Sequence, residues 1–245
     1  MDDPYFNKIA SSATLPAASA RELLEEGFVV KPGPFSPRLM QNLAETYDSM
    51  MQSDTGSDFK IASTTTRLND IVNRGPAFDD LYLHFPLLEA CRYVIRAPFK
   101  LSSLLGRTLR AGSAAQRLHS DMPRDSPDAP MVGFILMIDD FETDNGATQF
   151  IPTSQNWADV PSDHPAASEP IYPERVLACG QAGSMIIFDA SILHGHTANS
   201  TTSPRRSIQG YFVQRGARSG TNFSSRMSQE TFDRISPFAR YLLSV

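Results

Sequence analysis

The chain has 245 residues, 41% of them hydrophobic, which is enough to bury a continuous core around a pocket. Its 22 Lys and Arg residues against 27 Asp and Glu residues give a formal net charge of −5, and no run of five basic residues occurs. This balance argues against a nucleic-acid partner and against binding to an anionic membrane surface.

Cysteine content and hydropathy indicate the cellular compartment. The two cysteines, Cys91 and Cys179, lack the paired spacing of a zinc or redox motif, so we expect buried, reduced thiols and treat a disulfide as the less favoured alternative. The first 20 residues contain no apolar signal segment, and no stretch reaches the roughly 18 apolar residues of a membrane span. We therefore expect a soluble, cytoplasmic monomer or homodimer without membrane partners, folded as a single domain over residues 1–245.

The N-terminal third is expected to be mainly helical. Residues 1–18 are polar and rich in Ala, Ser and Pro, which predicts an irregular segment. Ser19 and Glu22 have the spacing of a capping box, and Gly27 is a C-terminal signal, so a helix is expected between them. The apolar residues 28–30 then predict a short strand.

A second helix is expected from residue 37, with Ser36 as its N-cap and Pro37 at its first position. Residues 53–73 are polar and then mixed, which predicts a loop over a pocket mouth. The predicted core face of this second helix consists of Leu39, Leu43, Tyr47 and Met50.

A third helical stretch is expected over residues 78–95, interrupted by Pro86, with His84 as a packed or half-exposed structural histidine and not a ligand. Beyond residue 98 the pattern changes to short runs that alternate at period two or are fully apolar, separated by turn residues. Helices followed by strands predict an α+β protein with a β-sandwich or barrel core. The predicted strands lie within 99–109, 114–122, 131–141, 146–154, 175–183, 184–196 and 205–215.

His119 and Asp121 form the first half of a candidate metal site. Residues i and i+2 of a strand point to the same face, so this imidazole and this carboxylate converge on one point. A His-x-Asp pair alone occurs often by chance and needs a third partner. His194, at the end of an apolar strand, is the candidate. Two imidazoles and one carboxylate suit Fe(II) and leave three coordination positions open.

An organic 2-oxo acid can occupy two of these positions and dioxygen the last. Such a co-substrate has a second carboxylate, for which a guanidinium is a planar, permanently charged partner. Arg205 begins the strand that follows the polar turn after His194, so we expect it across a hairpin from that histidine. Ser207 lies on the same strand face, where its hydroxyl can add a hydrogen bond.

At these positions the sequence resembles the phytanoyl-CoA dioxygenase family of Fe(II)- and 2-oxoglutarate-dependent oxygenases. The resemblance extends at a low level over the whole chain and is sharpest over residues 116–121, 145–154 and 188–211. The positions that match the family pattern are Gln116, His119, Asp121, Asn145-Gly146-Ala147-Thr148, His194-Gly195, Asn199 and Arg205.

The sequence departs from the family pattern in two ways. The "PGSH" turn of the family is here "PTSQ", residues 152–155, a difference that concerns the shape of the pocket and no metal ligand. His196 also offers a second imidazole beside His194. We assign His194, because Asn199 follows it by five residues and Arg205 by eleven, as in the family.

The resemblance implies a double-stranded β-helix, a jelly-roll and cupin-like fold, with N-terminal helices packed on one sheet. It implies Fe(II) bound by His119, Asp121 and His194, 2-oxoglutarate held by Arg205, and secondary contacts from Gln116 and Thr148. The implied reaction converts 2-oxoglutarate and O2 to succinate and CO2 while oxidising, most simply hydroxylating, an unactivated C–H bond. Because Asp121 is present where related halogenases have a small residue, the resemblance favours oxygen chemistry.

Several alternatives remain open at this point. Desaturation, epoxidation or cyclisation can replace hydroxylation, and the substrate can be an acyl-CoA, an amino acid or a specialised metabolite. We favour the last, since the chain has no Lys/Arg cluster suited to a CoA phosphate tail. A catalytically silent ligand-binding protein and an oxygenase or isomerase without an oxo acid are further alternatives. Residues that either line a substrate pocket or pack in the ordinary way are Arg67, Ser102, Ser103, Arg107 and Trp157.

Overall fold

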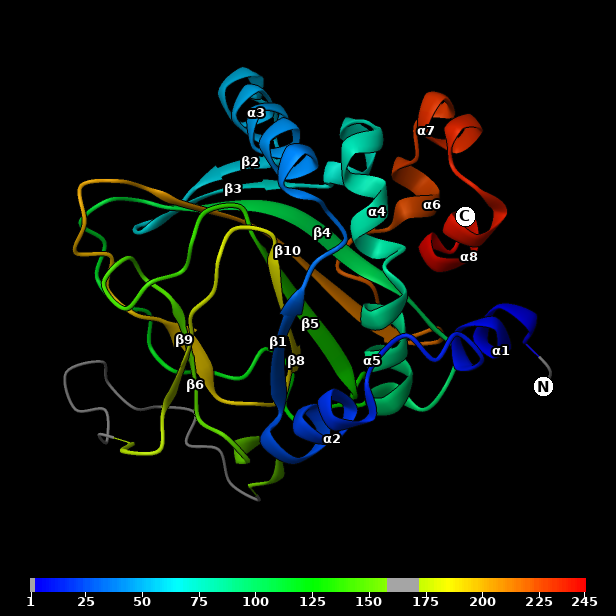
Figure 1. Ribbon diagram of the computed structural model, residues 1–245. Coiled ribbons are helices and arrows are strands. Elements are labelled where there is room, and N and C mark those ends of the chain that lie inside the picture. Colours follow the sequence, from blue (N-terminus) through cyan, green and yellow to red (C-terminus); the bar gives the residue numbers. More distant parts are fainter. Residues whose placement is uncertain (1–2, 158–171) are drawn as a thin grey trace.

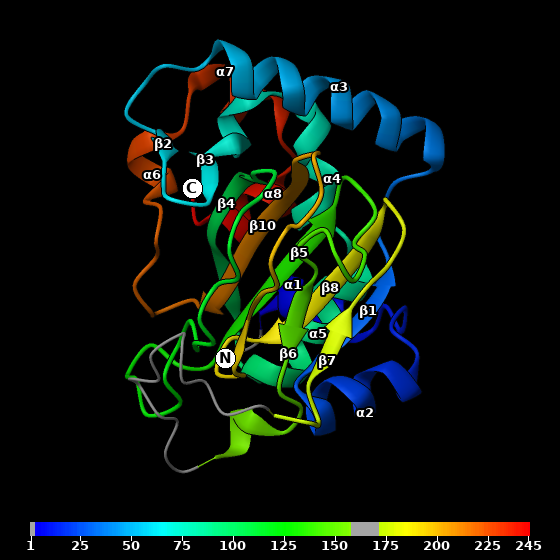
Figure 2. The same ribbon diagram turned by 90° about the vertical axis from the view of Figure 1, so that its left-hand side faces the viewer.

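Two antiparallel sheets form the centre of the protein in the computed structural model, which describes residues 3–157 and 172–245. The larger sheet has seven strands in the order β1 (Phe28–Pro32), β8 (Ser184–Asp189), β5 (Met131–Met137), β10 (Arg205–Gln214), β4 (Phe99–Leu109), β3 (Thr65–Asn69) and β2 (Phe59–Ile61). The smaller sheet has the order β7 (Val176–Ala178), β6 (Thr148–Phe150) and β9 (His194–His196). It lies in front of the larger one in Figure 2.

Helices cover the outer face of the larger sheet, opposite the small sheet (Figure 1). Both the N-terminal helices and a C-terminal group, which the sequence did not predict, contribute to this layer. The predicted α+β class, with helices packed on one sheet, is confirmed. The helices are α1 (Pro4–Ala10), α2 (Ala17–Glu26), α3 (Pro37–Ser53), α4 (Asp79–Tyr82), α5 (Phe85–Ile95), α6 (Phe223–Arg226), α7 (Gln229–Arg234) and α8 (Pro237–Leu243), with short 3-10 turns η1 (Ile71–Arg74), η2 (Pro76–Phe78) and η3 (Ser154–Asn156).

Strand β10 shows how alternation separates core from site. Ile208 and Phe212 point outward into the apolar layer beneath the helices. Arg205, Gln209 and Tyr211 point the other way, into a cavity between the two sheets. Because successive side chains of a strand face opposite sides, one strand supplies both the core and a row of polar groups.

The prediction of an irregular segment over residues 1–18 is wrong for residues 4–10 and for the start of α2 at Ala17, whereas residues 11–16 form no helix or strand. Residues 4–10 form α1, whose N-cap Asp3 accepts hydrogen bonds from the backbone N–H groups of Tyr5 and Phe6 at 3.1 and 3.0 Å. Ile9 is fully buried in the main core. A helix this short owes its stability to tertiary packing and capping, which local periodicity does not reveal.

Helix boundaries differ in detail from those predicted. Helix α2 ends at Gly27 in the left-handed conformation, as predicted, but it begins at Ala17, and Ser19 is a buried residue inside it. Helix α3 has the predicted cap at Ser36, whereas Leu39 is 48% exposed and Met40 takes its place on the core face. The core stripe of α3 is therefore Met40, Leu43, Tyr47 and Met50.

Two further predictions are corrected between residues 53 and 95. The predicted loop at 53–73 contains β2, β3 and η1, and β3 pairs with β4. Pro86 is the second residue of α5 and does not interrupt that helix, because its missing N–H is not needed in the first turn. His84 precedes α5 at the N-cap position and is partly buried.

Both cysteines are free, as predicted. Cys91 is buried, whereas Cys179 lies exposed after β7. Within residues 3–157 and 172–245, no helix combines the length and apolar character needed to cross a membrane.

Substitution of Gly210 tests how tightly the larger sheet is packed. A Cβ at this position would lie 2.5 Å from the ring of Phe134 and 3.0 Å from Leu104, so we expect Gly210→Ala to lower the free energy of unfolding by about 1–3 kcal/mol in urea denaturation. Gly216→Ala is the control, since nothing lies within 4 Å of its added Cβ, and it should be neutral or slightly stabilising. Equal effects of the two substitutions would contradict the tight packing at Gly210.

Candidate active site

Backbone hydrogen bonds to β9 and to the residues just before it place His119 and Asp121, the first two candidate ligands. The segment 114–122 was predicted as a strand, but it forms only an isolated bridge between His119 and His194. His119 N–H donates to the His194 carbonyl at 3.0 Å, and His194 N–H donates to the His119 carbonyl at 2.9 Å. Asp121 N–H donates to the carbonyl of Ala190 at 2.9 Å. The strand prediction is therefore wrong in extent, while the pairing still brings the two histidines together.

His119, Asp121 and His194 lie close enough to hold one metal ion, and we call them the triad. Nε2 of His119 lies 3.4 Å from Oδ1 of Asp121, and Nε2 of His194 lies 3.3 Å from Oδ2. One ligand atom from each residue lies within 4.8 Å of the others. The side chain of His194 is 8% exposed, that of Asp121 21% and that of His119 36%, so one side of the group stays accessible.

Hydrogen bonds to backbone carbonyls orient both imidazoles. Nδ1 of His119 lies 3.0 Å from the carbonyl of Arg117, and Nδ1 of His194 lies 3.0 Å from that of Ile192. Because a carbonyl only accepts hydrogen bonds, each Nδ1 carries the hydrogen. Each ring therefore presents its Nε2 toward Asp121, and Nε2 is the nitrogen that a histidine held in this way can offer to a metal.

Asp121 is held as a carboxylate. Burial alone would raise its pKa, but hydrogen bonds from His119 and His194, and the hydroxyl of Tyr211 donating to Oδ2 at 2.7 Å, hold the pKa of Asp121 well below its usual range. The anion is therefore present at neutral pH, and Tyr211 fixes its orientation.

Arg205 is a buried cation that lacks an anion. It is 3% exposed, its guanidinium lies 3.8 Å from the ring centroid of Phe141, and its Nε and Nη1 have no hydrogen-bond partner among the described residues. Burial, with a contribution from Arg107, lowers the pKa of Arg205 to about 9. A buried charge without a partner is costly, so this position favours an anionic ligand.

The predicted hairpin between His194 and Arg205 is not formed. Strands β9 and β10 belong to different sheets, and Arg205 reaches the same cavity as His194 from the opposite side. Asn199 shapes the crossing between them, because its side-chain N–H group donates to the carbonyls of Arg110 and Ser203 at 3.2 and 2.9 Å.

The three secondary candidates occupy two different settings. Gln116 and Thr148 line the cavity, and Nε2 of Gln116 lies 3.4 Å from Nε2 of His119. Ser207 is fully buried and its hydroxyl donates to the carbonyl of Arg107 at 3.2 Å, so this group is already used within the sheet.

His196 lines the cavity but does not belong to the triad. Its Nδ1 lies 2.9 Å from the carbonyl of Thr197. Burial, together with Arg107 and Arg205, lowers the pKa of His196 to about 4, so the ring is neutral at pH 7. The geometry therefore groups His194, and not His196, with His119 and Asp121.

Sequence reasoning missed Gln209 and Tyr211, which also line the cavity, and left Arg107 undecided. The signal was available, since both missed residues continue the alternation that begins at Arg205 and Ser207. Of the five residues named for either pocket or packing, Arg107 alone lines this cavity within the described part of the chain.

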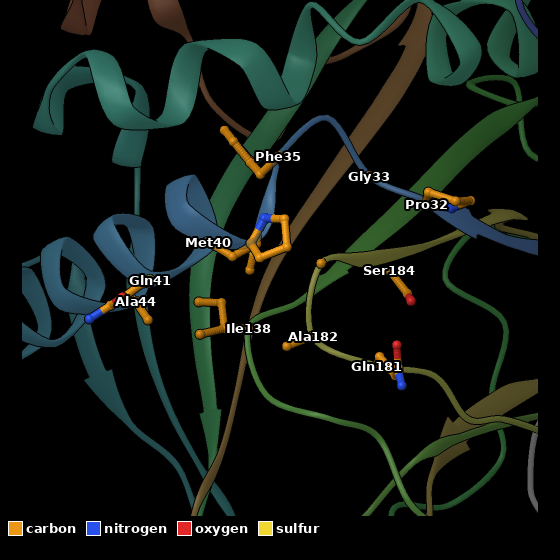
Figure 3. Close-up of a pocket in the computed structure, with 12 residues that line it drawn as sticks. Pro32, Gly33, Phe35, Met40, Gln41, Ala44, Ile138, Gln181, Ala182 and Ser184 are labelled. Atoms are coloured by element: carbon orange, nitrogen blue, oxygen red, sulfur yellow. The ribbon is translucent and has the colours of Figure 1, made fainter.

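A separate surface pocket of about 460 Å³ lies between the start of α3 and the turn before β8 (Figure 3). Phe35, Met40, Ile138 and Gln181 are among its lining residues. None of the predicted site residues reaches it, so it is distinct from the candidate site.

Comparison with known proteins agrees with this geometry. The family model described as phytanoyl-CoA dioxygenase (PhyH) matches residues 23–207. Dioxygenase trt7 of Aspergillus terreus is 29% identical over 210 residues, covering 79% of this chain and 71% of that protein. The chain spans between 51% and 71% of the length of the fungal dioxygenases that it matches.

Solved structures of two enzymes share the fold. The epimerase SnoN in complex with Fe3+, alpha ketoglutarate and nogalamycin RO has a TM-score of 0.66 and 20% identity, over 81% of this chain and 84% of that one. HygX from Streptomyces hygroscopicus with nickel and 2-oxoglutarate bound has a TM-score of 0.68 and 17% identity, over 84% and 90%. The predicted cupin-like fold is confirmed, with two facing sheets and no closed barrel.

The ligand-free protein provides a test of the buried cation. We expect Arg205→Met to leave the free energy of unfolding unchanged or to raise it by about 1–4 kcal/mol, because it removes a charge without an internal anion. Arg206→Met is the matched control. Arg206 forms ion pairs with Asp48 and Asp139 at 2.7 and 2.6 Å, so its replacement should destabilise the protein. Urea denaturation of the metal-free protein measures both, and equal destabilisation would show that Arg205 is satisfied internally.

Proposed function

Because the chain belongs to the phytanoyl-CoA dioxygenase family, we propose that it is an Fe(II)- and 2-oxoglutarate-dependent dioxygenase that oxidises an unactivated C–H bond of a small molecule. Hydroxylation is the outcome that we favour, with 2-oxoglutarate and O2 converted to succinate and CO2. One observation carries this proposal: the triad and the unpartnered guanidinium of Arg205 meet in the same cavity.

The donor set fits a ferrous ion. His119, Asp121 and His194 offer two imidazole nitrogens and one carboxylate, the facial set that non-haem iron oxygenases use. Bound iron would supply the activation of dioxygen. The chain keeps each donor in its binding form: carbonyls hold the Nδ1 hydrogens, and Tyr211 orients Asp121. The rings of Phe150 and Phe188 pack against His194, with ring centroids 5.7 and 4.9 Å away, and shield it from water.

Arg205 is the proposed partner of the distal carboxylate of 2-oxoglutarate. Its Nε and Nη1 have no hydrogen-bond partner among the described residues, and the buried setting strengthens an ion pair between a guanidinium and a carboxylate. Gln116 and Thr148 line the same cavity and are proposed as weaker contacts to the co-substrate. Ser207 is a candidate only if its hydroxyl leaves the carbonyl of Arg107.

We further propose a specialised metabolite as the substrate and the cytoplasm as the compartment, with residues 1–245 acting as one oxygenase domain. The first proposal is supported by HygX, solved with hygromycin B bound, and by SnoN, solved with nogalamycin RO. The second is supported by two cysteines that remain unpaired.

Substitutions of His194 and His196, which lie two residues apart, test the metal site. Anaerobic addition of Fe(II) and 2-oxoglutarate to the protein should produce the weak visible charge-transfer band of such chelates, with one iron per chain. We expect His194→Ala to abolish the band and lower iron affinity by more than about 100-fold, since altering even an outer partner of a metal ligand costs 10–100-fold. His196→Ala should still bind one iron per chain. The reverse pattern would show that His196, and not His194, binds the metal. The absence of the band in the wild-type protein would favour the alternative of a catalytically silent binding protein.

The co-substrate site is tested by Arg205→Gln. Losing a charge-assisted, bidentate partner should weaken 2-oxoglutarate binding by about 3 kcal/mol, or roughly 100-fold, while iron stoichiometry stays at one per chain. Isothermal titration under anaerobic conditions and succinate release in air measure the two effects. Unchanged 2-oxoglutarate affinity would contradict the role of Arg205 and favour an oxygenase that needs no oxo acid.

A further inference from the structure

Two more arginines face the cavity side of the larger sheet. Arg67 on β3 and Arg107 on β4 lie directly opposite one another, and Ser207 on β10 is the next residue in the same row. Arg107 lines the cavity together with His119 and Asp121. Like charges directly opposite in a sheet are destabilising, so this pair needs a compensating partner.

The described residues do not supply that partner. Among residues 3–157 and 172–245, no carboxylate lies within ion-pair distance of either guanidinium. The buried Nε atoms of Arg67 and Arg107 have no hydrogen-bond partner. The contacts of Arg107 are to two neutral amides, the Oε1 atoms of Gln116 at 3.3 Å and Gln209 at 3.4 Å. These amides accept hydrogen bonds but leave the positive charge in place.

Several arginines elsewhere in the protein do have carboxylate partners. Arg206 pairs with Asp48 and Asp139, Arg74 with Asp54, and Arg234 with Asp79. Arg67, Arg107 and Arg205 lack such pairs and all belong to β3, β4 and β10 on the inner face. Of the four arginines whose buried Nε has no hydrogen-bond partner among the described residues, three therefore lie on this inner face, and the fourth, Arg92, lies on α5.

Counting the charges in the site indicates that Arg67 and Arg107 are not needed to neutralise the co-substrate. On the proposed function, the cavity and the adjoining Arg67 together hold three guanidiniums, one ferrous ion and the Asp121 carboxylate, which give four net positive charges. The two negative charges of 2-oxoglutarate leave two uncompensated. Without Arg67 and Arg107 the loaded site would already be neutral, so these two residues call for a further anion.

We propose that Arg67 and Arg107 bind a carboxylate of the organic substrate, which makes the substrate a small organic acid. The inference rests on the proposed function and specifies its substrate class. Two guanidinium forks match the planar geometry of a carboxylate better than ammonium groups do. Because Arg107 lies beside Gln116, which in turn lies 3.4 Å from Nε2 of His119, an acid held there is tethered next to the metal.

The experiment compares benzoate with benzamide, two probes of the same shape that differ in charge. Each is titrated calorimetrically into the anaerobic protein loaded with Fe(II) and saturating 2-oxoglutarate, and the visible band reports that the co-substrate stays bound. We expect benzoate to bind at least tenfold more tightly than benzamide. Equal affinities would overturn the proposal.

Arg67→Gln and Arg107→Gln should each reduce the preference for benzoate to threefold or less while changing 2-oxoglutarate affinity by less than about threefold. Arg117→Gln is the matched control, since this exposed arginine near the site carries the same charge, and it should keep the full preference. If the two variants instead weaken 2-oxoglutarate as much as Arg205→Gln does, the pair serves the co-substrate and the proposal fails. Retention of the preference in both variants also overturns it.

The visible band separates failure of this inference from failure of the proposed function. A wild-type protein that gives no band with Fe(II) and 2-oxoglutarate contradicts the proposed function itself. A protein that gives the band but shows no preference for benzoate contradicts only the acidic substrate. The band also reports whether each arginine variant remains folded.

Discussion

The candidate site depends on one short piece of backbone pairing. His119 and His194 exchange two hydrogen bonds, at 3.0 and 2.9 Å, although 75 residues separate them in the chain. This exchange sets the two imidazoles side by side, with ring centroids 4.6 Å apart, and Asp121 then reaches both Nε2 atoms. Because backbone bonds fix the positions and carbonyls fix the tautomers, the site is organised before any ligand arrives.

Adjacent arginines on β10 show how the sheet assigns opposite roles to identical side chains. Arg206 points outward, and hydrogen bonds and ion pairs with Asp139 and Asp48 raise its pKa. Arg205 points inward, where burial without an anion lowers its pKa to about 9. The chemical identity of the two residues is the same, and only the alternation of the strand separates a stabilising ion pair from a ligand site.

Sequence patterns predicted what depends on local periodicity and spacing. The limits of β4, the first turn of α3 and the approach of His194 to His119 and Asp121 could all be predicted, because alternation, capping and motif spacing are written in adjacent residues. Helix α1 could not, since its stability comes from burying Ile9 against distant elements. The pairing of Arg67 with Arg107 also required the register between strands, which no single segment contains.

The unpaired charges have a consequence for stability. Three guanidiniums share one face of the larger sheet, and no carboxylate of the described residues lies within ion-pair distance of them, so the ligand-free protein carries an electrostatic cost that the apolar layer under the helices must offset. Anions that bind only the folded state recover this cost and stabilise the fold by mass action. The same arrangement that makes the empty site unfavourable therefore makes it selective, because a neutral molecule of equal shape cannot relieve it. On this argument, charge compensation decides which ligands bind, while the exchanged backbone bonds of His119 and His194 decide where the chemistry takes place.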